Sequence, residues 1–398
     1  MTAPVPSLRI NTKGVLLETV PLSKLAVAMW DFTWLTRRFG NEAEFADFER
    51  VLDEFCERGY NSLRIDPFPH YLSFLEEDHS RRDEFTVLPQ TYSKQWGNSV
   101  PITTGLRRPL ISFLEKCKER NLRVGLSTWF TPDTMDLRSG VRTPSDYVYV
   151  WQSTLRFIQK EGFADIIDWV DLCNEFPFMG WAYGACEEIF RTGTWNSLAY
   201  FLPWSKKTVS AVQKYIDQTI PALKKEFDLR FTFSCMCLPR KEHLININNF
   251  DLVEPHLWLT DTLSFGVPSI GLLSTAQFPL ANHMHAVAAS VLHPAFRKFW
   301  RRRLERYMDR IVLWAHKEGK PLITTEGWAS TMYGGGSLNE KETAWHWIKD
   351  VCHDAVHMAI EKGWTGICTS NFCQPHFPVM WKDVSWHRAL TAEILRYR

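Results

Sequence analysis

The chain has 398 residues, of which 45% are hydrophobic and 23% charged, and its formal net charge is +1. This length exceeds that of most single β-sandwiches but fits one (β/α)8 barrel with insertions. The nearly balanced charge gives no field that would attract nucleic acid or an anionic membrane, so neither partner is expected.

Nine cysteines are scattered along the chain, mostly inside apolar runs and without paired CxxC spacing. They predict reduced thiols in a cytoplasmic protein rather than a disulfide scaffold. The amino terminus, MTAPVPSLRINTKG, lacks a basic segment followed by an apolar stretch, so no secretory signal is predicted. No apolar run approaches the ~20 residues needed to cross a bilayer.

Short segments rich in β-forming residues alternate along the chain with segments of helical periodicity. Eight strands are predicted at 24–30, 60–65, 122–130, 167–173, 229–236, 250–259, 321–326 and 365–372. Helical patterns lie at 41–59, 107–121, 205–227, 295–319 and 340–363. Several strands are continuous apolar runs, as expected for parallel strands that are buried on both faces.

This alternation predicts an α/β fold, a closed (β/α)8 TIM barrel, because the turn after the first strand has no GxGxxG for a doubly wound sheet. One domain over residues 1–398 is expected, with 1–23 as an N-terminal extension packed on the barrel. Long connections at 66–104, 176–204 and 260–292 are expected to form a binding site or lid.

Chemistry in such a barrel sits at the C-terminal ends of the strands. The candidates at those positions, in chain order, are Trp30, Asp31, Arg64, Asp66, Trp129, Asn174, Glu175, His256, Trp258, Glu326 and Asn371, with Gln374 and His376 just beyond. We therefore expect the functional site to be built from this set.

Two acids stand out in the set, Glu175 after the fourth strand and Glu326 after the seventh. The fourth and seventh strands face one another across an eight-stranded barrel, so the two carboxylates are expected to converge. Retaining hydrolysis of a glycosidic bond needs such a pair ~5–5.5 Å apart, one as nucleophile and one as acid and base.

The motifs around these acids resemble a known family. NE at the end of the fourth strand and TTEG at the end of the seventh are similar to glycoside hydrolase clan A, the retaining (β/α)8 barrels, and especially to the cellulase-like family 5 group. The resemblance extends strand by strand from about residue 24 to 390.

The resemblance implies a role for each matching residue. Glu175 looks like the acid/base, and Asn174 looks like the residue that binds the sugar 2-hydroxyl. Glu326 looks like the nucleophile, and Arg64 is similar to the arginine that keeps the nucleophile ionised by lowering its pKa. His256 matches the histidine of the clan's His-x-Tyr motif.

The acid must begin the reaction protonated, so Glu175 is expected in dry, aromatic surroundings that Phe176, Phe178 and Trp181 would supply. Three positions depart from the family. Trp258 stands where the motif has tyrosine, Trp129 is nearest to the missing histidine of the third strand, and SNFCQPHF replaces a strand-8 tryptophan. These departures concern the substrate more than the chemistry.

Tryptophan is abundant, at 18 residues. Six of these lie near predicted strand ends and are candidates either for stacking on sugar rings or for ordinary packing: Trp30, Trp34, Trp129, Trp181, Trp328 and Trp381. The predicted substrate-binding residues are Trp30, Asp31, Arg64, Asp66, Trp129, Asn174, Trp181, His256, Trp258, Trp328, Asn371 and Trp381, the last of which lies a little beyond the missing strand-8 tryptophan.

The predicted function is retaining hydrolysis of short β-linked oligosaccharides or glycosides, with no cofactor and no metal. A non-catalytic carbohydrate-binding barrel and a transglycosidase of the same fold are the alternatives. A metal-dependent hydrolase would use the HMH motif at 283–285, which is expected in a loop rather than on a strand.

Overall fold

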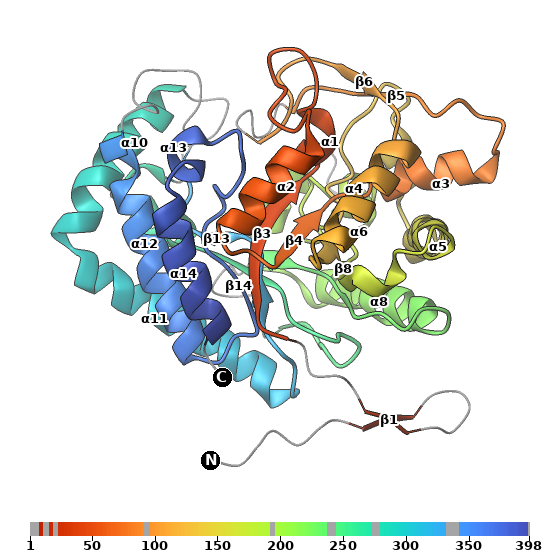
Figure 1. The fold of residues 1–398 in the computed structure, drawn as a ribbon. Helices are drawn as coiled ribbons and strands as arrows, with labels where there is room; N and C mark the ends of the chain where they lie inside the picture. The colour runs from red at the N-terminus through yellow and green to blue at the C-terminus, as the bar shows by residue number, and fades with distance from the viewer. Residues whose placement is uncertain are drawn as a thin grey trace.

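The computed structural model describes residues 8–10, 16–18, 23–90, 96–191, 196–236, 244–271, 279–331 and 342–396. Strands and helices alternate along the chain (Figure 1). The strands are β1 (Leu8–Ile10), β2 (Leu16–Glu18), β3 (Leu25–Asp31), β4 (Ser62–Ile65), β5 (Phe85–Val87), β6 (Ile102–Thr104), β7 (Arg123–Leu126), β8 (Ile167–Asp171), β9 (Phe231–Thr232), β10 (Cys235–Met236), β11 (Pro255–Trp258), β12 (Ile323–Thr324), β13 (Gly327–Trp328) and β14 (Gly366–Cys368).

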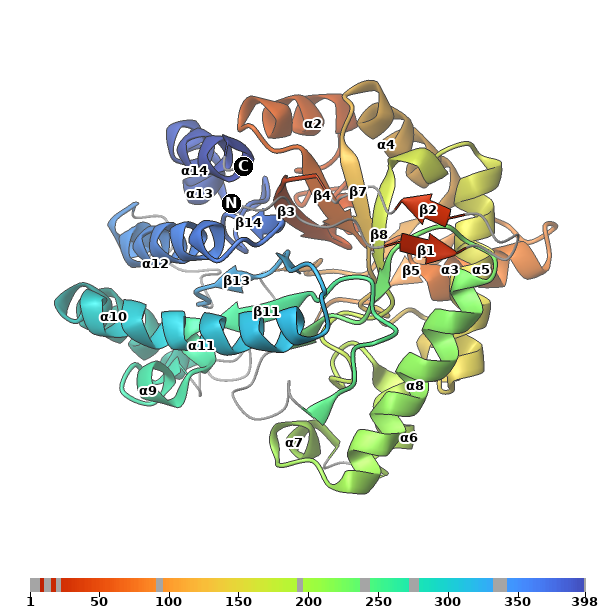
Figure 2. The same ribbon diagram turned by 90° about the horizontal axis from the view of Figure 1, so that it is seen from below.

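The α-helices cover most of the remaining chain. They are α1 (Thr33–Thr36), α2 (Phe48–Glu57), α3 (Pro69–Glu77), α4 (Arg107–Glu119), α5 (Pro144–Lys160), α6 (Tyr183–Phe190), α7 (Asn196–Phe201), α8 (Lys206–Lys224), α9 (Leu263–Gly266), α10 (Pro279–Ala295), α11 (Arg297–Lys317), α12 (Glu342–Glu361), α13 (Pro378–Trp381) and α14 (Val384–Arg396). Seen from below, α2, α4, α5, α8, α11, α12 and α14 surround the strands (Figure 2).

The strands close into a barrel. Seven parallel strands run in the order β12-β14-β3-β4-β7-β8-β9, and three more run in the order β10-β11-β13. Since β10 directly follows β9, and β13 directly follows β12, these two pairs are the halves of the fifth and seventh barrel strands. The (β/α)8 barrel and all eight predicted strands are thus confirmed.

Side chains alternate between the barrel interior and the helix layer, as the pleat of a strand requires. Leu25 and Val27 of β3 form an interior cluster with Trp169 of β8. Trp30 of the same strand instead joins the larger core between barrel and helices. Trp169 fits because its neighbour on β7 is Gly125, where an added Cβ would lie 2.1 Å from the indole.

Helix α2 shows why the helices begin and end where they do. The carboxylate of Asp47 caps its first turn by accepting a hydrogen bond from the Arg50 N–H. Gly59, with φ of +81°, follows its last turn in the left-handed conformation that glycine adopts without strain. The predicted helix at 41–59 therefore starts later than expected, at the cap.

The long connections carry structure of their own. The connection after β4 contains α3 and the β5–β6 hairpin, that after β8 contains α6 and α7, and that after β11 contains α9 and α10. The HMH segment, predicted in a loop, lies within α10. Cysteines 117, 173 and 368 are buried free thiols, as predicted for reduced cysteines.

Apart from β1, β2 and Ser23, the predicted N-terminal extension lies outside the described residues, so its packing on the barrel stays a prediction. Among the helices in the described part of the chain, none combines the length and apolar character needed to cross a bilayer.

Candidate active site

The fourth barrel strand delivers Asn174 and Glu175 through a tight, well-held turn. Glu175 has a φ of +49°, which is unusual for a residue with a side chain. Its N–H donates to Ser234 Oγ at 2.9 Å, and the Ser234 N–H donates to Asp171 Oδ1 at 2.7 Å. The Asn174 N–H donates to the Thr128 carbonyl at 2.9 Å. Neighbouring strand ends on both sides thus fix this turn.

The seventh strand delivers Glu326 between its two halves, β12 and β13. The Thr324 hydroxyl donates to the Glu326 carbonyl at 2.9 Å, and the Thr325 hydroxyl donates to Glu254 Oε1 at 2.6 Å. The hydroxyls of two successive threonines therefore tie this strand end to itself and to the sixth strand.

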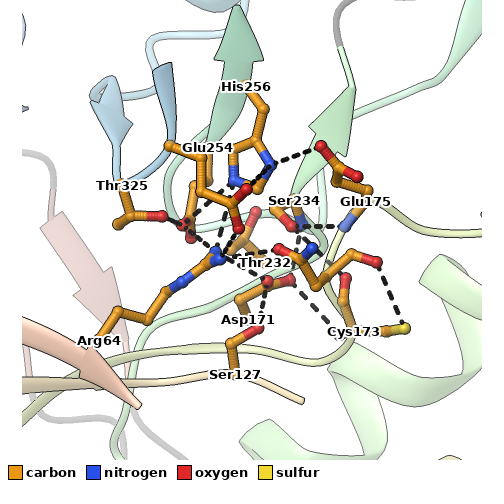
Figure 3. Close-up of polar contacts among 12 residues, drawn as sticks. Arg64, Ser127, Asp171, Cys173, Glu175, Thr232, Ser234, Glu254, His256 and Thr325 are labelled. Atoms are coloured by element: carbon orange, nitrogen blue, oxygen red, sulfur yellow. Dashed lines mark hydrogen bonds and ion pairs between the residues drawn. The ribbon is translucent and has the colours of Figure 1, made fainter. Parts of the chain in front are cut away.

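Arg64 of β4 is the hub of the site and is fully buried (Figure 3). Its Nη1 donates to Glu254 Oε1 at 2.6 Å, and its Nη2 donates to Asn174 Oδ1 at 2.7 Å and to Glu326 Oε1. Nη1 also lies 3.4 Å from Asp171 Oδ2. One guanidinium therefore contacts groups from the fourth, sixth and seventh strands.

His256 of β11 connects the acids from the other side (Figure 3). Its Nδ1 lies 3.2 Å from Glu175 Oε1 and 3.9 Å from Glu326 Oε2, and its Nε2 lies 3.8 Å from Glu254 Oε1. Burial disfavours the charged ring, but the carboxylates of Glu326, Glu175 and Glu254 outweigh it and raise the pKa of His256 to about 10. The imidazolium thus donates to Glu175 at neutral pH.

Glu175 and Glu326 converge, as predicted from their strands. One oxygen of each, together with a His256 ring nitrogen, lie within 4.8 Å of one another, and all three residues are buried. Two carboxylates at this spacing can act on one atom between them.

The ionisation of Glu326 differs from the expectation. Burial raises its pKa to about 7, against the opposing effects of His256 and Arg64. Arg64 does contact Glu326, but its charge is divided among other carboxylates, so it does not bring this pKa below the ordinary range. Arg64 instead limits a rise that burial would otherwise make larger.

The same three residues have donor types that a metal ion could use, but the surrounding charge opposes a cation. His256 is an imidazolium, whereas a metal ligand must be neutral, and the Arg64 guanidinium already occupies Glu326. The HMH histidines do not form a site together either, because His283 is exposed and His285 is buried, on different faces of α10.

Two amides in the site have hydrogen-bonding atoms without a partner. Asn174 Nδ2 and Asn371 Oδ1 are both buried and make no hydrogen bond among the described residues. Asn371 is brought to the site by its N–H, which donates to the Gly327 carbonyl at 2.8 Å, next to Glu326. Buried polar atoms are normally satisfied, so these two are available to a ligand.

Three of the predicted tryptophans lie at the site. Trp181 Nε1 is 3.4 Å from Glu175 Oε2. The Arg64 guanidinium lies 4.6 Å from the centre of the Trp129 ring. Trp258 follows His256 by two residues on β11 and therefore faces the same way.

The other four tryptophans, Trp30, Trp34, Trp328 and Trp381, are buried in packing, which was the second alternative for them. The placement of Trp30, Trp328 and Trp381 in the substrate-binding set is therefore wrong. Trp30 packs between barrel and helices against Phe55 of α2. Trp34 donates to the Asp66 carbonyl at 2.9 Å, Trp328 donates to the Cys368 carbonyl at 3.0 Å, and Trp381 donates to Glu54 Oε2 at 2.6 Å. The indole N–H groups of all four form hydrogen bonds within the protein.

Asp31 and Asp66, predicted to bind substrate, are occupied by their own loops. Asp66 accepts from the N–H groups of Phe68 at 2.7 Å and Trp129 at 2.9 Å. Asp31 accepts from the Thr33 N–H at 2.6 Å and from Gln374 Nε2 at 3.3 Å. Both act as turn-forming carboxylates.

Sequence reasoning missed three acids of the site, Glu254, Asp171 and Asp261. Glu254 and His256 are two residues apart, and so are Trp169 and Asp171, so the period of a strand places each pair on one face. That alternation was the available signal. Asp261 follows β11, and burial, together with the Glu175 carboxylate, raises its pKa to about 7; no pattern in the sequence marks it.

The whole chain was compared with known proteins and solved structures. A crystal structure of a candidate glycoside hydrolase from Parabacteroides distasonis is 28% identical over 94% of both chains, with a TM-score of 0.79. An endo-1,4-β-D-mannanase from Thermotoga petrophila is 10% identical over 87% of both chains, with a TM-score of 0.45. No curated protein matches the chain.

The model of one family matches residues 27–395, nearly the whole barrel, and its description is sugar-binding cellulase-like. This match confirms the cellulase-like resemblance of the strand-end motifs. The chain belongs to the cellulase-like family.

Proposed function

We propose that the protein is a retaining β-glycoside hydrolase that acts on β-linked oligosaccharides or glycosides. The observation that carries the proposal is the approach of Glu175 and Glu326, with oxygens within 4.8 Å of one another. Retaining enzymes hold their two carboxyl groups ~5–5.5 Å apart, whereas inverting enzymes need ~6.5–9.5 Å to admit a water.

Glu326 is the nucleophile in this proposal. Its carboxylate attacks the anomeric carbon, and the new ester bond forms as the glycosidic C–O bond breaks. Arg64 supports this assignment because it donates to Glu326 directly and favours the carboxylate form.

Glu175 is the acid and then the base. It gives its proton to the departing oxygen, and later takes a proton from the water that attacks the anomeric carbon and frees Glu326. His256 donates to Oε1, which leaves Oε2 to carry the proton beside Trp181.

Asn174 and Asn371 bind the sugar. The free N–H groups of Asn174 Nδ2 lie beside the Arg64–Glu326 pair, where they reach the 2-hydroxyl of a glycosyl group bound to Glu326. Asn371 Oδ1 accepts from another hydroxyl at the end of the eighth strand, where the related enzymes offer a flat indole. The binding surface at this position is therefore a hydrogen-bonding one.

Trapping with 2-deoxy-2-fluoro β-glycosides that carry an activated leaving group tests the proposal. We expect the peptide containing Glu326 to gain the mass of one fluorosugar, and Glu326→Gln to gain none. Glu175→Gln should still release the aryl group of a glycoside with a good leaving group in a rapid first turnover, because that departure needs no proton, but it should hydrolyse the resulting ester slowly and lose activity on alkyl glycosides. Glu318→Gln, an exposed residue after α11, is the matched control.

The alternatives give different results. A non-catalytic carbohydrate-binding barrel would bind sugars, but the native chain and both glutamate variants would show neither turnover nor labelling. A transglycosidase would be labelled at Glu326 but would pass the sugar to an added acceptor in preference to water. Labelling of any other residue would overturn the assignment of Glu326.

A further inference from the structure

A pair of histidines lies far from the active site, on the outer face of α12. His353 and His357 are one helical turn apart, and their Nε2 atoms are 3.1 Å from each other. Their side chains are 50% and 33% exposed. Helix α14 lies beside α12 (Figure 1), and its Glu393 places Oε2 3.1 Å from His357 Nδ1.

The carboxylates around the pair decide where the ring protons sit. Glu393 Oε2 is placed to accept from a proton on His357 Nδ1, which is the tautomer that leaves a lone pair on His357 Nε2. On the other side, His353 Nδ1 is 3.8 Å from Asp354 Oδ1, a carboxylate that Arg297 holds with two contacts of 2.9 Å. Both rings therefore turn their Nδ1 toward an acid and their Nε2 toward each other.

The spacing of the two Nε2 atoms matches that of two ligands on one ion. Imidazole nitrogens bound to a tetrahedral metal at ~2.0–2.1 Å stand about 3.3 Å apart. Two histidines four residues apart on a helix present such a pair from one face. A carboxylate on the far nitrogen is the usual partner of a metal-bound histidine.

We propose that His353 and His357 form a surface site for a divalent ion that favours imidazole, namely Zn²⁺, Ni²⁺ or Cu²⁺, with Glu393 orienting His357. Water completes the coordination. Both ligands lie on α12, and Glu393 of α14 contacts the site through His357 Nδ1, so ion binding would strengthen this contact between the two helices. It takes no part in the reaction proposed above and does not depend on it.

Calorimetric titration of the full, tag-free chain with ZnCl2 tests the site. We expect one ion per chain, with at least tenfold weaker binding in His353→Ala and in His357→Ala. Glu393→Gln should weaken binding about tenfold, as is typical for the loss of an outer partner. His346→Ala is the matched control, since this exposed histidine lies on the same helix and its removal should leave the affinity unchanged.

A second measurement uses Cu²⁺ as a probe. Its electron paramagnetic resonance spectrum should show coupling to two imidazole nitrogens in the native chain and to fewer in either histidine variant. Zn²⁺ should also raise the melting temperature of the native chain and not that of the double variant. Equal affinity in the native chain and both single variants, or no binding to the native chain, would overturn the site.

Discussion

Individual residues at this site serve opposing requirements. In the proposed mechanism Glu326 must be ionised to attack carbon, yet it is buried, and burial favours its neutral form. Arg64 and His256 oppose that effect without cancelling it, so the pKa of Glu326 reaches about 7. Near neutral pH the carboxylate and the carboxylic acid of Glu326 are therefore both populated.

The first prediction concerns the pH dependence of turnover. A nucleophile must be deprotonated, so kcat/KM for an aryl glycoside should fall as pH falls through about 7, with a slope of one proton. Rates measured from pH 5 to 9 check this, with enzyme stability recorded at each value. An activity that stays constant down to pH 5 would contradict the raised pKa of Glu326.

The second prediction concerns the unpaired amide of Asn174. Asn174→Ala should lower kcat about 10²-fold on a substrate with a 2-hydroxyl, because a contact that strengthens in the transition state is lost. On the matching 2-deoxy substrate the native chain and the variant should differ little. A similar loss on both substrates would mean that Asn174 acts by holding Arg64 rather than the sugar.

At the scale of the element, strand alternation decides which residues reach the site. Glu254, which directly precedes β11, shares a face with His256 of that strand, and on β3 the face opposite to Trp30 carries Leu25 and Val27. Selecting every residue at a strand end therefore predicts too many site residues. Applying the two-residue period would have removed Trp30 and added Glu254 from the sequence itself.

The packing below the site gives the third prediction. In Gly125→Ala the new Cβ would meet the Trp169 indole at 2.1 Å, and Trp169 would have to move away from Glu254, to which it donates at 3.1 Å. We expect a loss of about 1–3 kcal/mol in the free energy of unfolding, as for other overpacked cores.

Urea denaturation of this variant measures the loss. Gly140→Ala is the control, since nothing lies within 4 Å of its added Cβ and its backbone is not in the left-handed region. Gly125→Ala should also lower kcat, because Glu254 anchors Arg64. Equal stability of the two variants would show that the strand moves to accommodate the methyl group.

At the scale of the molecule, the barrel brings together residues that are distant in sequence. The fold and the two catalytic candidates could be predicted because eight apolar runs and the motifs NE and TTEG are local signals. The contacts of Arg64 could not all be predicted. Its hydrogen bonds reach four partners between residues 171 and 326, and these partners come together only because the barrel closes. Nor does any local pattern identify the loop roles of Asp31 and Asp66.

The fourth prediction links the active site to the stability of the whole chain. A carboxyl whose pKa rises on folding stabilises the fold below its unfolded pKa, and this contribution is lost as pH rises through the folded value. For Glu326 the window is from about 4.5 to about 7. Glu326→Gln, which cannot ionise, should therefore melt higher than the native chain at pH 8.

At pH 5 the difference in melting temperature between Glu326→Gln and the native chain should be much smaller. Melting temperatures of both chains at the two pH values test this, with Glu318→Gln as the surface control. A difference that is the same at pH 5 and pH 8 would mean that shape rather than charge at residue 326 sets the stability.

The left-handed backbone conformation of Glu175 has a consequence for the evolution of related proteins. A side chain in that conformation costs of order 1–3 kcal/mol, which glycine avoids and asparagine tolerates better. A lineage that gave up glycoside turnover would gain stability by drifting to either residue. If Glu175 has the proposed role, related barrels that keep an acid at this point should be the ones that turn over glycosides.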